Sequence, residues 1–360
     1  MERLDGWKNE PVRIAIAGPS VVGKSSFINV MLGKSKCDRA KVGIGNTTQE
    51  RTFYYHPKNK GLQFWDLPGY GTPEFELNEE YLKSMRIEEY DFVLIMYSTV
   101  ISSTDINFAR KLMKANKMFA FVRTKADEFL DMKEKPFEQW CREAKTKCQN
   151  TLKDKGVSFE NEKEQIFVIS NKKPEKGDCD NLMNFLTENT VELKRMNILI
   201  TLRRQTLPMI DEKEKQLLSR ALKAAIAMGI STHLPIPDVD IGFNIVLLKH
   251  EITFYLEIFQ LDKESLKEHS QFAVAKLKFC QEIIRDGIHK FIMHNIAKLA
   301  MVTTFSNVFE ITIPILGGIL NESISAARMY SFLRKVISKL ADEARELNRE
   351  QANDRVKRNC

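Results

Sequence analysis

The feature that most constrains this chain is the nine-residue stretch GPSVVGKSS, from Gly18 to Ser26. It matches the pattern G-x-x-x-x-G-K-[ST], and it lies between an apolar run, VRIAIAG, and the helical run SFINVML. Gly18 and Gly23 allow a tight turn that brings backbone N–H groups close to bound phosphates, and the helix that follows adds the positive end of its dipole. The pattern therefore predicts a phosphate-binding loop between a strand and a helix.

The side chains of this loop have chemical roles in that prediction. Lys24 is expected to neutralise the β- and γ-phosphates, and Ser25 is expected to supply a hydroxyl ligand to Mg²⁺. Val22 and Ser26 flank the Gly-Lys-Ser core and complete the predicted nucleotide contacts of the loop. The loop therefore predicts a phosphate site together with part of a magnesium site.

A second motif, Asp66-Leu-Pro-Gly69, lies at the end of the strand-like run GLQFWD. Asp66 is expected to hold Mg²⁺ through water, and the Gly69 N–H is expected to contact the γ-phosphate. Between the two motifs, GIGNTTQER contains Thr47 and Thr48, one of which should close over Mg²⁺ in the triphosphate state. We favour Thr48, although a plain surface loop is an equally good interpretation of either threonine alone. The predicted catalytic residues are Lys24, Thr48 and Gly69, and the predicted metal ligands are Ser25, Thr48 and Asp66.

The choice of base is predicted from RTKAD, which ends at Asp127 and follows the apolar run MFAFV. The Asp127 carboxylate can accept hydrogen bonds from guanine N1–H and from the N2 amino group, whereas adenine offers no such pair of donors. The Lys125 stem can lie along the face of the base, and Thr124 stands where GTPases usually have Asn. Ser170 and Asn171, in the stretch ISN, are expected to form the final base loop. These elements predict GTP and GDP as ligands rather than adenine nucleotides.

Short apolar runs alternate with helical patterns over the first half of the chain. The runs that predict strands are Val12–Gly18, Gly61–Asp66, Phe92–Ser98, Met118–Arg123 and Gln165–Ser170. Helical patterns between them, such as 103–116 and 136–156, predict a mainly parallel, doubly wound sheet of the α/β class. From about residue 191 the chain shows long helical patterns instead, so we predict an α/β domain over 8–190 and an all-α helical domain over 191–360. One apolar stripe in the last pattern contains Phe332, Leu333, Val336, Ile337, Leu340 and Ala341.

The composition excludes several classes of function. Hydrophobic residues make up 43% of the 360 residues and charged residues 29%, which is typical of a globular chain. The net charge of +7 comes from basic residues spread among acids, so we expect no nucleic-acid partner, while attraction to anionic membranes stays open. The six Cys show no C-x-x-C spacing and the first residues form no apolar segment, so a cytoplasmic protein without zinc, disulfides or a signal peptide is expected.

Two apolar stretches, Ala224–Leu248 and Phe305–Leu320, resemble membrane spans at first sight. Prolines and acidic residues interrupt both of them, which favours buried helix hairpins over spans. The alternative is that the hairpin around Leu234–Ile241, or the run 305–320, inserts at a bilayer surface in the GTP state.

The stretches GPSVVGKSSFIN, WDLPGYGTP, YDFVLI, FVRTKAD and IFVISN, followed by LPIPDVDIGFNIVLL and LDKESLKEHS, together resemble the immunity-related GTPases, the interferon-inducible IRG family. The resemblance covers nearly the whole chain. It implies a Ras-like P-loop GTPase domain joined to a helical domain. It also implies slow GTP hydrolysis, self-association through the GTPase domains, and action on intracellular membranes in cell-autonomous defence.

The resemblance assigns the same residues that the motifs indicate. They are Gly23, Lys24, Ser25 and Ser26 in the phosphate loop, Thr48 in the switch, Asp66 and Gly69 at the γ-phosphate, and Thr124, Lys125, Asp127, Ser170 and Asn171 at the base. Lys24 also matches the branch of the family with Gly-Lys-Ser in its loop rather than the branch with Gly-Met-Ser.

Tyr70 follows the Asp-x-x-Gly motif at the position where small GTPases carry the Gln that orients the attacking water. A phenol has one hydroxyl and no amide to bridge water and γ-phosphate, so slow hydrolysis is expected of the monomer. The leading hypothesis is a GTP hydrolase activated when its GTPase domains form a homodimer or oligomer in the GTP state. The polar candidates for that contact are Asn46, Gln49, Glu50 and Arg51. The alternatives are a GTP-dependent switch or scaffold with negligible hydrolysis, and a metabolic or translation GTPase of bacterial type.

Overall fold

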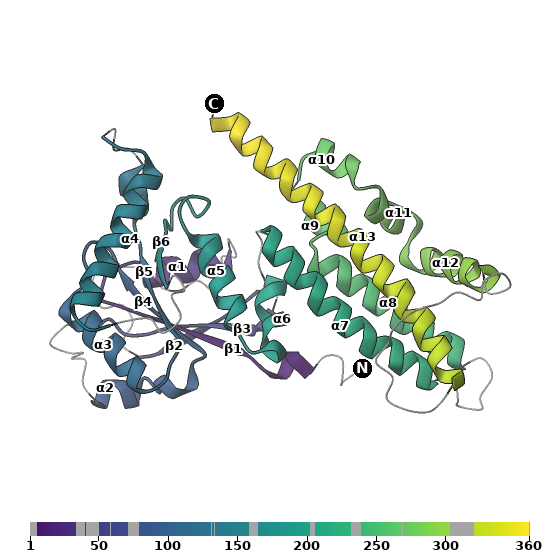
Figure 1. The fold of residues 1–360 in the computed structure, drawn as a ribbon, viewed down its shortest axis with the longest axis horizontal. Coiled ribbons are helices and arrows are strands. Elements are labelled where there is room, and N and C mark those ends of the chain that lie inside the picture. The colour runs from purple at the N-terminus through teal and green to yellow at the C-terminus, as the bar shows by residue number, and fades with distance from the viewer. Residues whose placement is uncertain are drawn as a thin grey trace. The chain divides into compact units, whose positions relative to one another are not determined.

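The computed structural model describes residues 6–33, 40, 50–57, 59–70, 79–130, 132, 134–157, 165–201, 206–231, 239–267, 269–302 and 320–359. The chain divides into two compact units (Figure 1). The sheet unit runs from Asp5 to Thr201, and the helical unit contains Leu202–Cys360 together with Met1–Leu4. The division therefore lies after residue 201, beyond the boundary at 190 that the change in sequence pattern predicts.

A six-stranded sheet of order β2-β3-β1-β4-β5-β6 forms the centre of the sheet unit. Its strands are β1 (Val12–Ala17), β2 (Thr52–His56), β3 (Asn59–Asp66), β4 (Phe92–Tyr97), β5 (Phe119–Arg123) and β6 (Ile166–Val168). All neighbours run parallel except β2 and β3, which form an antiparallel pair at one edge. The strands β4, β5 and β6 are buried on both faces, as continuous apolar runs predict.

The five predicted strands are all present, but the edge strand β2 was not predicted. Its sequence TFYYH leaves Phe53 and Tyr55 exposed, at 42% and 43% of their surface. An edge strand with exposed aromatic side chains lacks the inward apolar face from which a strand is usually recognised.

Helices cover both faces of this sheet, and Figure 1 shows α3 and α4 on one side and α5 and α6 on the other. The helices of the unit are α1 (Lys24–Leu32), α2 (Glu79–Ser84), α3 (Ser103–Lys114), α4 (Phe137–Asp154), α5 (Cys179–Glu188) and α6 (Glu192–Thr201), with 3₁₀ turns η1 (Gly6–Asn9), η2 (Ile87–Glu89) and η3 (Ala126–Phe129). A capping box of Ser102 and Asp105 begins α3. The core beneath α3 includes Tyr70, Phe108 and Phe121.

Buried polar contacts hold α6 against the sheet, at the strand end opposite to the phosphate loop. The Asn197 side chain is fully buried, accepts a hydrogen bond of 2.9 Å from Asn59 Nδ2, and donates one of 2.9 Å to the carbonyl of Glu10. A Cβ at position 61 would lie 2.0 Å from Asn197 Oδ1, so a side chain there would displace this buried amide. The Lys194 ammonium adds an ion pair of 2.8 Å to Asp91. These contacts explain why α6 belongs to the sheet unit.

The helical unit consists of α7 (Leu207–Ser231), α8 (Val239–Ile258), α9 (Lys263–Leu266), α10 (Gln271–Lys276), α11 (Lys278–Asp286), α12 (Ile288–Val302) and α13 (Leu320–Asn359). The longest of these, α13, packs along α7. All six residues of the predicted apolar stripe in α13 are buried, so that prediction is confirmed. The sequence shows helical patterns over 211–228 and 332–351, and α7 and α13 extend beyond these patterns at both ends.

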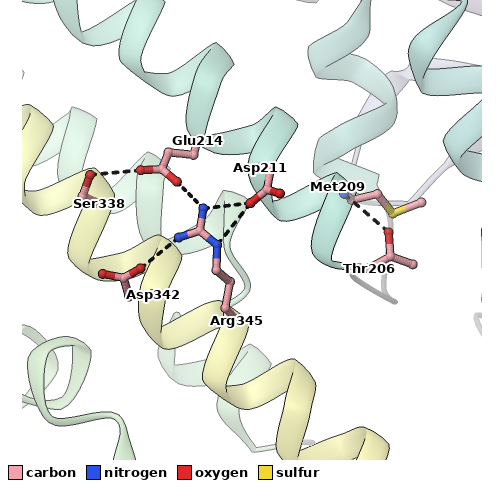
Figure 2. A network of polar contacts seen from close by, with 7 residues as sticks. All are labelled: Thr206, Met209, Asp211, Glu214, Ser338, Asp342 and Arg345. Atoms are coloured by element: carbon pink, nitrogen blue, oxygen red, sulfur yellow. Dashed lines mark hydrogen bonds and ion pairs between the residues drawn. The ribbon is translucent and has the colours of Figure 1, made fainter.

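Arg345 of α13 connects the two long helices through charged groups, as Figure 2 shows. Its guanidinium contacts Asp211 of α7 at 2.8 Å, Asp342 of its own helix at 2.9 Å, and the Glu214 carboxylate. Ser338 donates a further hydrogen bond of 2.9 Å to Glu214. Because several charges share one partly covered network, this contact is worth more than an isolated surface ion pair.

Among the residues that the structure describes, no helix combines the length and the apolar character that crossing a bilayer requires. The two segments considered for membrane insertion, 234–241 and 305–320, lie almost wholly outside the described residues.

Candidate nucleotide-binding site

The phosphate loop joins β1 to α1, where the sequence predicts it. Gly18 has a φ of +143°, and a Cβ there would lie 2.3 Å from the carbonyl oxygen of Met96 on β4. Gly23, just before α1, has a φ of +103°. Both positions therefore require glycine, since other residues rarely adopt this backbone and no side chain fits at Gly18.

Lys24 and Ser25 occupy the first turn of α1. The Lys24 ammonium donates hydrogen bonds to the carbonyls of Gly18 at 3.0 Å and Pro19 at 2.9 Å. Burial lowers the pKa of Lys24 to about 8, and the nearby Asp66 carboxylate opposes that shift. The cation thus lies inside the loop, next to the N-terminus of a helix, where phosphate binding is favoured.

Ser25 and Asp66, two of the three predicted metal ligands, lie in direct contact. The Ser25 hydroxyl donates a hydrogen bond of 2.6 Å to Asp66 Oδ2, and the Asp66 side chain is almost fully buried. A hydroxyl and a carboxylate side by side at a phosphate loop form the oxygen donor set that Mg²⁺ prefers. The residues present therefore fit a magnesium ion. Thr48, the third predicted ligand, and Thr47 lie outside the described residues.

The Asp-Leu-Pro-Gly motif lies directly against the phosphate loop. A Cβ at Gly69 would approach Ser20 Oγ to 2.5 Å and Ser20 N to 2.8 Å, so only glycine permits this contact. The Tyr81 hydroxyl of α2 donates a hydrogen bond of 2.9 Å to the carbonyl of Pro68. The structure therefore places Gly69, the predicted γ-phosphate contact, next to the phosphate loop. The hydrogen bond from Tyr81 fixes the backbone of the preceding residue, Pro68.

Tyr70 points into the core beneath α3 rather than toward the phosphate loop. Its side chain is 1% exposed, and its hydroxyl donates a hydrogen bond of 2.7 Å to Asp105 Oδ1. The ring meets Tyr81 and Phe108 edge-on, with centroids 6.2 Å and 5.4 Å apart. Burial, and then the Asp105 carboxylate, raise the pKa of Tyr70 well above its ordinary value. The phenol is therefore a neutral core group, and no side-chain atom of residue 70 is available to the attacking water.

The two predicted base loops both bond to the phosphate loop. Thr124 is fully buried, and its hydroxyl donates to the carbonyl of Val22 at 2.6 Å. Asn171 Nδ2 donates to the carbonyl of Gly23 at 3.1 Å. Thr124, which departs from the usual Asn of GTPases, thus connects the base and phosphate ends of the site through one hydroxyl.

Asp127 lies between Ser170 and Lys172. The Ser170 hydroxyl donates to Asp127 Oδ1 at 2.9 Å, and the Lys172 ammonium lies 3.0 Å from Oδ2. Burial opposes ionisation of Asp127, but the hydrogen bonds from Lys172 and Ser170 outweigh it and hold its pKa below the ordinary value. Asp127 is therefore an anionic acceptor at neutral pH. Lys125, the residue just before η3, has a positive φ of 59°.

Sequence reasoning did not identify Lys172 as part of the site. It follows the stretch ISN directly, and this adjacency to the predicted base loop was the only available signal. Arg51, one of the polar candidates for the contact between GTPase domains, has partners within its own chain. Its guanidinium forms an ion pair of 2.8 Å with Glu89 and lies 4.9 Å from the centre of the Trp65 ring.

A model of the interferon-inducible GTPase family, IIGP, matches residues 1–351. The chain belongs to the interferon-inducible GTPase family. Membership places the chain among GTPases, the class that the motifs predict, and confirms the suspected resemblance. The parallel sheet with its phosphate loop and the separate all-helical unit likewise confirm the predicted fold class.

Named relatives differ in how much of the chain they match. Interferon-inducible GTPase 1 of Mus musculus is 32% identical over 264 residues, which cover 71% of this chain and 63% of the mouse protein. Interferon-gamma-inducible GTPase 10 of Mus musculus is 32% identical over 274 residues, covering 73% and 64%. Interferon-inducible GTPase 5 of Bos taurus is 27% identical over 350 residues, covering 93% and 74%. The chain thus matches a little under two thirds of the length of the two mouse relatives.

Among solved structures, that of an Aquifex aeolicus Era variant bound to GDP·AlF4⁻ is 23% identical, with a TM-score of 0.36. The match covers 51% of this chain and 57% of that one.

We predict that Tyr70→Gln does not accelerate GTP hydrolysis by this interferon-inducible GTPase. The side chain at position 70 packs under α3, so a glutamine there does not reach the attacking water. Losing the buried ring should lower the free energy of unfolding by roughly 3–5 kcal/mol. Single-turnover hydrolysis and urea denaturation measure the two effects. A hydrolysis rate ten times that of the wild type would show that residue 70 turns toward the phosphates.

Proposed function

We propose that this chain binds GTP and GDP with Mg²⁺ and hydrolyses GTP slowly as a monomer, with acceleration on self-association of its sheet units. Family membership supports the GTPase class. The paired Ser25 and Asp66 oxygens support the magnesium site, and the anionic Asp127 supports the choice of guanine. Lys24 neutralises the phosphates, and Gly69 contacts the γ-phosphate.

The burial of Tyr70 is the observation that best supports slow GTP hydrolysis by the monomer. A GTPase without a residue that orients water keeps the positioning of its phosphates but loses much of the transition-state stabilisation. A group supplied by a second subunit can restore about 10³ to 10⁵ in rate. The proposed candidates for that group are Asn46, Gln49, Glu50 and Arg51, of which Arg51 also pairs with Glu89 in its own chain.

The choice of guanine can be tested at Asp127. We predict that Asp127→Asn weakens GTP binding by about 2–3 kcal/mol, roughly 30- to 150-fold, because an amide cannot accept both guanine donors. The same variant should bind xanthosine triphosphate better than the wild type does, since its NH₂ can donate to the oxygen at C2. Glu128→Gln, at the exposed neighbouring position, is the matched control and should bind like the wild type. Calorimetry measures these affinities, and equal GTP and ATP affinity in the wild type would contradict the assignment.

The role of self-association can be tested by dilution. We predict that GTP turnover per molecule rises with protein concentration, and that a GTP analogue promotes dimers while GDP does not. Turnover over a hundredfold concentration range, together with light scattering in each nucleotide state, measures both. Constant turnover with a monomer throughout would favour the second candidate function, a GTP-dependent switch or scaffold with negligible hydrolysis, which the burial of Tyr70 also suits.

We extend the proposal to intracellular membrane surfaces and to cell-autonomous defence. Family membership and the names of the interferon-inducible relatives support the defence setting. The net charge of +7 favours attraction to anionic lipids. We predict GTP-dependent flotation with liposomes that contain phosphatidylserine, weaker flotation with GDP, and loss of binding in high salt. Absence of flotation in both nucleotide states would remove the membrane from the proposal.

A further inference from the structure

Tyr70 connects two parts of the sheet unit that are distant in sequence. Its backbone follows Gly69, which lies against Ser20 of the phosphate loop. Its hydroxyl bonds to Asp105 Oδ1, inside the first turn of α3. The residue next to the predicted γ-phosphate contact is therefore also a contact of α3.

The Asp105 carboxylate divides its two oxygens between Tyr70 and the start of α3. Oδ2 accepts hydrogen bonds of 2.7 Å from both the backbone N–H and the hydroxyl of Ser102, and Oδ1 accepts the bond from Tyr70. The Ser102 hydroxyl accepts a bond of 3.1 Å from the Asp105 N–H, which closes the capping box. Asp105 is 1% exposed, so these donors stand in place of water around a buried charge.

The first turn of α3 also follows closely after β4, which borders the phosphate loop. The carbonyl oxygen of Met96 on β4 lies so near Gly18 that a Cβ there would approach it to 2.3 Å. The Tyr97 carbonyl accepts a hydrogen bond of 2.8 Å from the Thr124 N–H of the base loop. The start of α3 thus has two short connections to the nucleotide site, one along the chain from β4 and one through Tyr70.

We propose that Tyr70 is a positioning residue that links the γ-phosphate contact at Gly69 to the capping of α3, so that the first turn of α3 differs between the GTP and GDP states. The inference rests on the proposed function, because it requires Gly69 to contact the γ-phosphate. Adjacent Cα atoms stay about 3.8 Å apart, so a shift of Gly69 carries the Tyr70 backbone with it. The Tyr70 ring lies in a close-packed core, so it cannot absorb that shift without moving its contacts. One of those contacts is Asp105, which also caps the first turn of α3.

This link gives the tyrosine a role that glutamine cannot fill. A glutamine at position 70 lacks the ring that packs against Tyr81 and Phe108, and its amide would place an NH₂ group in the same core. In this chain the residue after Gly69 therefore serves to transmit the state of the site, and the orientation of water falls to another group.

Hydrogen exchange of the α3 amides tests the link directly. The full chain is loaded with GDP or with a non-hydrolysable GTP analogue, and exchange is followed at residues 103–107. Tyr70→Phe removes only the hydroxyl that reaches Asp105. Tyr255→Phe is the matched control, because Tyr255 is fully buried in the helical unit and its pKa is raised by burial and then by the Glu251 carboxylate.

In the wild type and in Tyr255→Phe, the exchange rates of these amides should differ several-fold between the two nucleotide states. In Tyr70→Phe the difference should fall below twofold, while GDP affinity stays within twofold of the wild type. A structural role alone would instead raise exchange equally in both states and keep the difference. That result, or identical exchange in both states of the wild type, would overturn the link.

A second variant, Asp105→Asn, tests the link independently in case Tyr70→Phe does not fold. Asp105→Asn keeps an oxygen for the Tyr70 hydroxyl but replaces the acceptor of Ser102 with an NH₂ group, so it cuts the link at the α3 end. It should abolish the nucleotide dependence as well, and a retained difference would count against the link. Calorimetry on the wild type separates the two levels of the argument. Absence of guanine nucleotide binding rejects the proposed function and the link together, whereas binding with unchanged α3 exchange rejects the link alone.

Discussion

The contact between Ser25 and Asp66 is the interaction on which the rest of the site depends. It joins the first turn of α1 to the end of β3, and the register of β1 with β3 sets it, because Ile16 pairs with Asp66. Leu67 continues the pairing by donating a backbone hydrogen bond of 3.1 Å to Ile16. Once these strands are aligned, Gly69 must lie next to Ser20. Two motifs that are distant in sequence thus meet because parallel strands end at the same edge of the sheet.

Much of the fold could be predicted because the relevant signals are local. The phosphate loop has a strict spacing, the parallel strands are continuous apolar runs, and the stripe in α13 has a clear helical period. The edge strand β2 could not be predicted, because its aromatic side chains Phe53 and Tyr55 are exposed. The boundary at residue 201 could not be predicted, because the sequence of α6 has the same helical pattern as the unit that follows it. What assigns that helix to the sheet is its long-range contacts, such as those of Asn197 with Asn59 and Glu10 and of Lys194 with Asp91.

In the candidate site, too, features set by short motifs could be predicted, whereas features set by contacts between distant residues could not. The types of residue at the phosphates and at the base follow from motifs, and the described members of these motifs lie together. The direction of Tyr70 does not follow from its motif, since it depends on Asp105 and Phe108 in a helix that comes later in the chain. The contact of Lys172 with Asp127 likewise depends on how two loops meet. Thr124 shows how a departure from a pattern is accommodated, because its hydroxyl reaches the Val22 carbonyl directly.

The attachment of α6 has a practical consequence for dividing this protein. A fragment ending at residue 190 would retain all described residues of the candidate site but lose Asn197 and Lys194. Asn59 and Asp91 would then lose partners at the end of the sheet far from the phosphates, and apolar surface beneath α6 would meet water. Such a fragment would be prone to aggregate, and its poor behaviour would be easily misread as a defect in nucleotide binding. The natural end of the nucleotide-binding unit is the last turn of α6.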